Sequence, residues 1–128
     1  MRYRHEDVAR VCYAAIRQLR EIQGDGRGPV WDLLTDEEQR WYILQVELAR
    51  QGLLPEQVHD RWSAGLAADG WILGPEVNLQ KRTHPELTEW SGLSAEKRLR
   101  YSIIQMTTNA LTVDVPPVWS GMRSVTAV

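Results

Sequence analysis

The sequence lacks most of the features that mark specialised classes of protein. It contains a single cysteine, Cys12, so an intrachain disulfide is excluded. No apolar run approaches the ~20 residues of a membrane-spanning helix, and the first residues lack the apolar stretch of a signal peptide. The net charge is only −2, so no overall positive field is present to hold nucleic acid. We therefore expect an intracellular, cytoplasmic protein with no membrane contact, and the charge balance argues against a nucleic-acid partner.

The composition is otherwise that of an ordinary globular domain, except in its aromatic residues. The 128 residues are enough for one domain with one core, and 43% of them are hydrophobic. Six tryptophans and four tyrosines are present, but no phenylalanine. Tryptophan combines a large stacking face with one N–H donor, so it suits a core, an interface or a planar ligand.

Apolar spacing and capping residues predict four helices. Apolar residues recur at intervals of three and four over residues 6–22. Thr35 and Glu38 form a capping box before a helix that runs to about Arg50. Pro55 suits the first turn of a third helix, which Gly70 ends. A fourth helix is expected over 94–111, and its apolar residues predict an inner face of Leu99, Ile103, Met106 and Ala110.

Residues 69–87, DGWILGPEVNLQKRTHPEL, interrupt this helical pattern. Trp71, Ile72 and Leu73 favour extended structure, and Gly74-Pro75 indicates a turn. Residues 87–90 are expected to form a returning strand, which would give a short β-ribbon. The predicted fold is therefore mainly α, a small bundle of about four helices with a β-ribbon. It occupies residues 1–111, and the tail 112–128 is expected to be irregular or ordered by a partner.

Motifs that would indicate catalysis are missing from the sequence. It has neither a phosphate-binding glycine loop nor a serine in a G-x-S-x-G turn. His59-Asp60 resembles the His-Asp pair of some metal-dependent phosphohydrolases, but no histidine spacing completes a ligand set. Cys12 falls on the apolar face of the first helix, where an inert, buried thiol is expected. We expect no catalytic residue, no metal site and no cofactor.

A group of aromatic and cationic residues around 59–84 is the best candidate for a binding site. His59 and Trp62 project from neighbouring positions of the third helix. Two indoles, two imidazoles and two cations would suit a planar, anionic ligand through stacking and charge-assisted hydrogen bonds. The predicted ligand-binding residues are His59, Trp62, Trp71, Lys81, Arg82 and His84.

The order of these motifs resembles the ryanodine receptor repeat, or RyR domain, in the single-copy form found in bacteria and phages. The resemblance covers about residues 7–111. It is carried by H-x-x-W from His59, G-W-x-x-G from Gly70, K-R-x-H-P from Lys81 and L-S-x-E-K from Leu93. It implies a small, mainly helical, non-catalytic unit. The family's repeats occur in tandem pairs whose cleft can take an adenine nucleotide, and Trp62 and His59 would line that cleft.

These observations favour a non-enzymatic module that binds a nucleotide-like small molecule. A single copy lacks a tandem neighbour, so we expect a homodimer to rebuild the pair. Two alternatives stay open: an interaction or structural domain without a small ligand, and a DNA-binding regulator whose ribbon acts as a wing.

Overall fold

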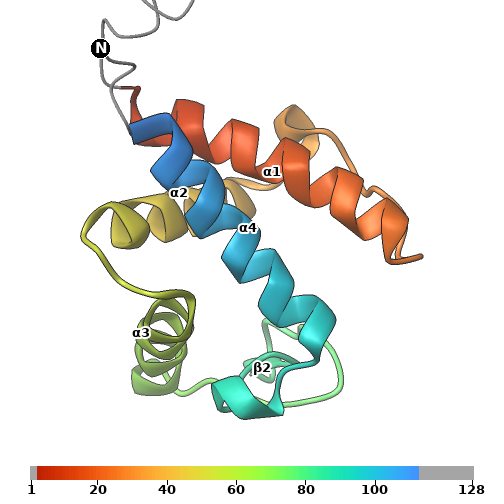
Figure 1. Ribbon diagram of the computed structural model, residues 1–128. Helices are drawn as coiled ribbons and strands as arrows, with labels where there is room; N and C mark the ends of the chain where they lie inside the picture. The colour runs from red at the N-terminus through yellow and green to blue at the C-terminus, as the bar shows by residue number, and fades with distance from the viewer. Residues whose placement is uncertain (1–2, 113–128) are drawn as a thin grey trace, which may run out of the picture.

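The computed structural model describes residues 3–112, which form four α-helices and one pair of very short strands (Figure 1). The helices are α1 (His5–Ile22), α2 (Asp36–Arg50), α3 (Pro55–Ala68) and α4 (Ala95–Thr112). The strands are β1 (Ile72–Leu73) and β2 (Thr83–His84), and 3₁₀ turns lie at Trp31–Leu33 and Trp90–Gly92. The predicted mainly α fold is confirmed. The predicted tail lies outside the described residues, apart from Thr112 at the end of α4.

Local signals in the sequence explain where the helices begin. The Thr35 hydroxyl accepts a hydrogen bond from the Glu38 N–H at 3.1 Å, and the Glu38 carboxylate accepts one from the Thr35 N–H at 3.1 Å. These two bonds satisfy backbone donors that the first turn of α2 would otherwise leave unpaired. Pro55 occupies the first turn of α3, where the missing N–H costs nothing.

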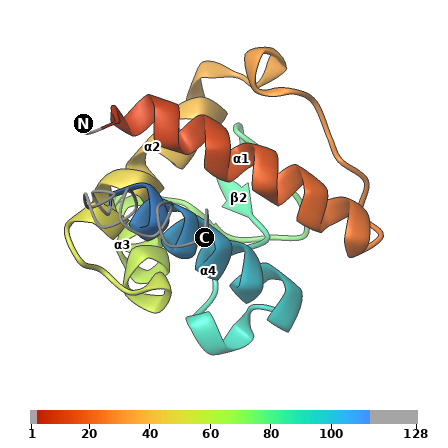
Figure 2. The same cartoon turned by 45° about the horizontal axis from the view of Figure 1, so that its top comes forward.

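The main core lies where α1, α2 and the second half of α4 meet (Figure 2). Cys12 is completely buried there, and its thiol donates a hydrogen bond to the Ile104 carbonyl at 3.7 Å. The prediction of a buried thiol is confirmed, and burial raises the pKa of Cys12. A smaller cluster joins α2, α3 and α4 through Leu48, Val58, Leu93 and Tyr101.

The predicted inner face of α4 is wrong at Leu99, Met106 and Ala110, whereas Ile103 is partly buried against the main core. Leu99 and Met106 are 44% and 62% exposed, whereas Tyr101, Ile104 and Thr108 are buried. The helix carries apolar side chains on two opposite sides, and spacing alone does not distinguish them. The buried face is hard to recognise in the sequence because it includes the polar residue Thr108, whose hydroxyl lies 3.7 Å from the Cys12 thiol.

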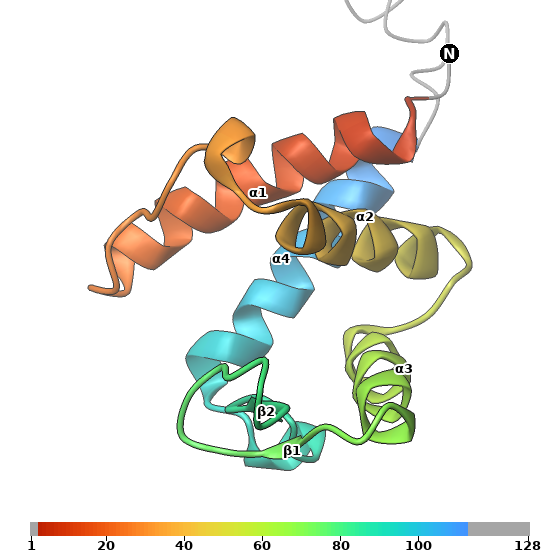
Figure 3. The same ribbon diagram turned by 180° about the vertical axis from the view of Figure 1, so that it is seen from behind.

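The predicted returning strand at 87–90 is also wrong. β1 pairs with β2 in parallel, with Ile72 opposite Thr83 and Leu73 opposite His84. A Cβ atom at Gly74 would lie 2.5 Å from the Thr83 side chain, so only glycine allows this approach. Figure 3 shows the paired strands beside the first turn of α4, at the opposite end from the main core.

Replacing Thr35 with alanine tests the start of α2. We expect Thr35→Ala to lower the free energy of unfolding by about 1 kcal/mol, because the Glu38 N–H loses its acceptor. Thr35→Ser keeps the hydroxyl and should stay close to the unmodified protein. Urea unfolding followed by circular dichroism measures both, and equal stabilities for the two variants would contradict the role of the cap.

Candidate functional site

His59 lies in the interior of the protein, where both of its ring nitrogens are hydrogen-bonded. Its exposed fraction is 0%. Nε2 lies 2.7 Å from the Thr88 carbonyl oxygen and Nδ1 lies 2.9 Å from the Tyr101 hydroxyl. A carbonyl only accepts, so Nε2 carries a proton, and in the Nε2–H tautomer Nδ1 accepts from the Tyr101 hydroxyl. His59 therefore joins α3, α4 and the segment before Trp90.

Trp62 and His84 pack against each other beside this buried ring. Their ring centroids are 4.9 Å apart at nearly perpendicular planes, and both side chains are partly buried. Trp62 also lies edge-to-face with Trp41 at 6.4 Å. The His84 Nδ1 accepts a hydrogen bond from the Glu86 N–H at 3.0 Å. Burial is the main cause that lowers the pKa of His84.

The other three predicted residues lie farther out. Lys81 and Arg82 are exposed, and Arg82 donates to the Asp69 carbonyl. Trp71 is partly buried and lines an open groove with residues from α3. The structure thus brings His59, Trp62 and His84 together and leaves Lys81, Arg82 and Trp71 apart from them. Whether any of the six contacts a ligand stays a prediction.

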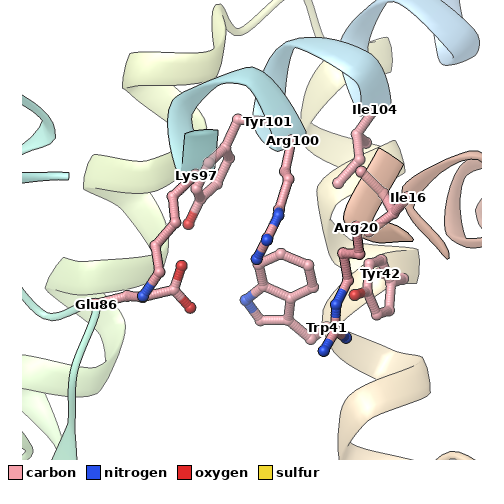
Figure 4. A pocket seen from close by; sticks show the side chains of 9 residues that line it. All are labelled: Ile16, Arg20, Trp41, Tyr42, Glu86, Lys97, Arg100, Tyr101 and Ile104. Carbon is pink, nitrogen blue, oxygen red and sulfur yellow. The ribbon is translucent and has the colours of Figure 1, made fainter. Parts of the chain in front are cut away.

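A pocket of about 230 Å³ lies between α1, α2 and the start of α4, and the sequence reasoning missed it. Figure 4 shows its side chains, with Arg100 reaching toward the Trp41 indole and Arg20 lying beside Tyr42. Three aromatic residues, three cations, one carboxylate and two aliphatic residues line it: Trp41, Tyr42, Tyr101, Arg20, Lys97, Arg100, Glu86, Ile16 and Ile104.

The charge of this pocket is mainly positive and partly uncompensated. Neither Arg20 nor Lys97 forms an ion pair with any residue between 3 and 112. The Arg20 Nε is buried and has no hydrogen-bond partner in the same range. Glu86 is the single carboxylate in the lining. An anionic group placed here would gain charge-assisted hydrogen bonds that the protein itself does not supply.

Arg100 is held in place from the opposite wall. Its Nε donates to the Gln23 side-chain oxygen at 3.0 Å, and its Nη2 donates to the Asp25 carboxylate. Gln23 in turn donates to the Glu96 carbonyl at 3.3 Å. These bonds tie the end of α1 to the first turn of α4, so the loop after α1 fixes one cation of the pocket.

Aromatic rings form the rest of the pocket wall. Trp41 contacts Tyr42 at 4.7 Å and Tyr101 at 6.0 Å between ring centroids, both edge-to-face. Burial raises the pKa of both Tyr42 and Tyr101 well above the usual range, so both phenols stay neutral. The sequence contains one signal that could have revealed this site. Lys97 and Arg100 share a helical face with Tyr101 and Ile104, and lysine and arginine rarely lie on a buried face unless they are paired.

Within residues 3–112, no three His, Cys, Asp or Glu side chains are grouped so that they could hold a metal ion. None of the helices described there combines the length and the apolar character needed to cross a membrane.

The fold and site define a small, mainly helical domain with one cationic, aromatic pocket. The sequence profile of the RyR domain matches residues 43–113, which is more than half of the chain. The chain therefore belongs to the RyR domain family, a family of non-catalytic repeats. No curated protein and no solved structure matched it.

Tyr101→Phe tests the buried imidazole. The ring stays in place, but His59 Nδ1 loses its partner, so we expect a loss of about 1–3 kcal/mol in unfolding free energy. Tyr42→Phe is the matched control, since the Tyr42 hydroxyl forms no hydrogen bond with any residue between 3 and 112. It should cost distinctly less, as measured by urea unfolding. A larger loss for Tyr42→Phe would contradict the proposed bond.

The lowered pKa of His84 predicts a pH dependence of stability. Folded His84 binds its proton less tightly than the unfolded chain does, so the folded protein is favoured while the imidazole is neutral. This contribution is complete above the unfolded pKa of about 6.5 and is lost as the pH falls below it. In His84→Asn, the fall in melting temperature between neutral and mildly acidic pH should be shallower. An unchanged slope would contradict the assignment.

Proposed function

We propose that this protein is a binding module without catalytic activity, and that it recognises a planar, anionic small molecule of the nucleotide kind. The ligand occupies the pocket between α1, α2 and the start of α4. One observation carries the proposal: Arg20, Lys97 and Arg100 converge on the same small space as Trp41 and two tyrosines. Cations suit a phosphate, and indole and phenol rings suit a base.

The unpaired cations support an anionic ligand more strongly than the number of charges does. Arg20 and Lys97 have no carboxylate partner among residues 3–112. Arg100 is already oriented by Gln23 and Asp25. A guanidinium held in position loses less side-chain entropy when it binds a phosphate. The site therefore combines one fixed cation with two cations that a ligand would neutralise.

The size of the pocket limits what it holds. Its volume of about 230 Å³ is somewhat below the roughly 300–1,000 Å³ of common small-molecule pockets. A mononucleotide would therefore extend toward solvent, with its most anionic part against Arg20 and Arg100. In the homodimer expected from the sequence, a second copy of the chain would cover this exposed part of the nucleotide. The homodimer stays a prediction.

The residues singled out in the sequence take supporting roles in this proposal. His59 holds the Tyr101 hydroxyl, and Tyr101 is part of the pocket wall. Trp62 packs against Trp41, which is another part of that wall. Both residues then act by positioning the pocket, without touching the ligand.

Isothermal titration with ATP, ADP and cyclic adenine nucleotides tests the proposal. At least one should bind, and Arg20→Ala should weaken it by about tenfold or more, since a charge-assisted hydrogen bond contributes roughly 1.5–3 kcal/mol. Arg40, an exposed arginine of α2 outside the pocket, is the matched control, and Arg40→Ala should bind normally. Chromatography should recover the nucleotide unchanged.

Two results would overturn the proposal. The first is the absence of binding by every nucleotide tested. The second is binding that Arg20→Ala leaves unaltered, which would place the ligand elsewhere. Conversion of the nucleotide during the titration would contradict the non-catalytic part alone.

A further inference from the structure

A second and wider pocket, of about 480 Å³, lies on the far side of α3. We call it the α3 groove. Three segments build it: Asp60, Ser63 and Ala67 on one face of α3, then Trp71, Ile72 and Leu73 around β1, and then Leu87, Thr88 and Glu89. The positions 60, 63 and 67 follow helical spacing, so they form one continuous wall.

The wall formed by 87–89 is fixed by contacts behind it. The Thr88 carbonyl accepts from His59 at 2.7 Å, and the Thr88 N–H donates to the Glu86 carbonyl at 2.9 Å. Gly92 packs so closely that a Cβ atom there would lie 2.3 Å from the Thr88 hydroxyl oxygen. One wall of the α3 groove is therefore fixed by a partly buried hydrogen bond and by the close approach of Gly92 to the Thr88 side chain.

The charge of the α3 groove is opposite to that of the first pocket. Asp60 and Glu89 are its two charged lining residues, and both side chains belong to exposed residues. Trp71 lies in the lining with them. Two carboxylates and an indole form a suitable environment for a cation, which gains ion pairing from the acids and a cation–π contact from the ring.

Exposed apolar side chains continue from the α3 groove onto the surface. Ile72 and Leu73 are 61% and 57% exposed, although β1 fixes their backbone. Val77 and Leu79 in the following loop are 58% and 66% exposed. A small ammonium ion would leave these side chains in water, whereas a chain segment with apolar residues on both sides of a cation would cover them.

We propose that the α3 groove binds a segment of a partner protein that presents an arginine or lysine side chain between apolar residues. The cation lies between Asp60 and Glu89 over Trp71, and the flanking apolar side chains cover Ile72 and Leu73. This inference goes beyond the proposed function, because it concerns a different site with the opposite charge.

The test uses a capped pentapeptide, Ala-Leu-Arg-Leu-Ala, and the same peptide with neutral citrulline in place of arginine. Binding is followed in ¹⁵N-labelled protein through the indole N–H signal of Trp71, which Trp71→Phe identifies. The arginine peptide should shift this signal saturably at millimolar concentration, and the citrulline peptide should bind at least about fivefold more weakly.

Matched variants locate the binding. Asp60→Asn and Glu89→Gln should each weaken the arginine peptide by about threefold or more, because each removes one ion pair. Glu56→Gln removes an exposed carboxylate from the same helix outside the α3 groove, and it should bind normally. Circular dichroism confirms that each variant keeps its helices.

Several outcomes would overturn the proposal: no saturable shift, equal binding of the two peptides, or normal binding by both Asp60→Asn and Glu89→Gln. Arginine amide binding as tightly as the pentapeptide would also overturn it, because the site would then recognise a small cation. Nucleotide titrations of the same variants are scored separately, since the first pocket does not contain Asp60 or Glu89.

Discussion

The buried imidazole of His59 is the constraint on which the arrangement of both pockets depends. Removing a polar ring from water is costly unless each nitrogen finds a partner, and here Tyr101 and the Thr88 carbonyl are those partners. The bond to Tyr101 fixes an aromatic wall of the first pocket, and the bond to Thr88 fixes one wall of the α3 groove. One buried side chain therefore links α3, α4 and the segment 87–89, next to the small apolar cluster that joins α3 to α4.

The distribution of charge gives a protein with a net charge of −2 two pockets of opposite charge. Three cations and one carboxylate line the first pocket, whereas two carboxylates line the α3 groove. Over distances longer than about 8 Å, salt screens exposed charges from one another. Each surface therefore presents its own local charge to a ligand, and the overall balance says little about either. The net charge of −2 provides no overall positive field for nucleic acid, and it does not exclude specific recognition of an anion.

The sequence predicts those features that depend on the chemistry of a single residue. It does not predict those that depend on how separate helices pack together. Thr35 and Pro55 mark helix starts through their own chemistry, and Cys12 lies within a long apolar stripe. The inner face of α4 was missed because Leu99 and Met106 form an equally good stripe, and only contact with α1 selects Ile104 and Thr108. The first pocket was missed because Arg20 and Arg100 are 80 positions apart in the chain, and the loop after α1 brings them together.

The family match divides the first pocket into two parts with different origins. Glu86, Lys97, Arg100, Tyr101 and Ile104 lie within the matched residues 43–113, whereas Ile16, Arg20, Trp41 and Tyr42 precede them. The matched part supplies two cations and one ring, and the preceding part supplies the unpaired arginine and the indole. Membership of the RyR domain family therefore accounts for the scaffold of α3 and α4 but not for the wall contributed by α1. A ligand of the kind proposed would contact both walls, so its identity would depend as much on this preceding segment as on the shared domain.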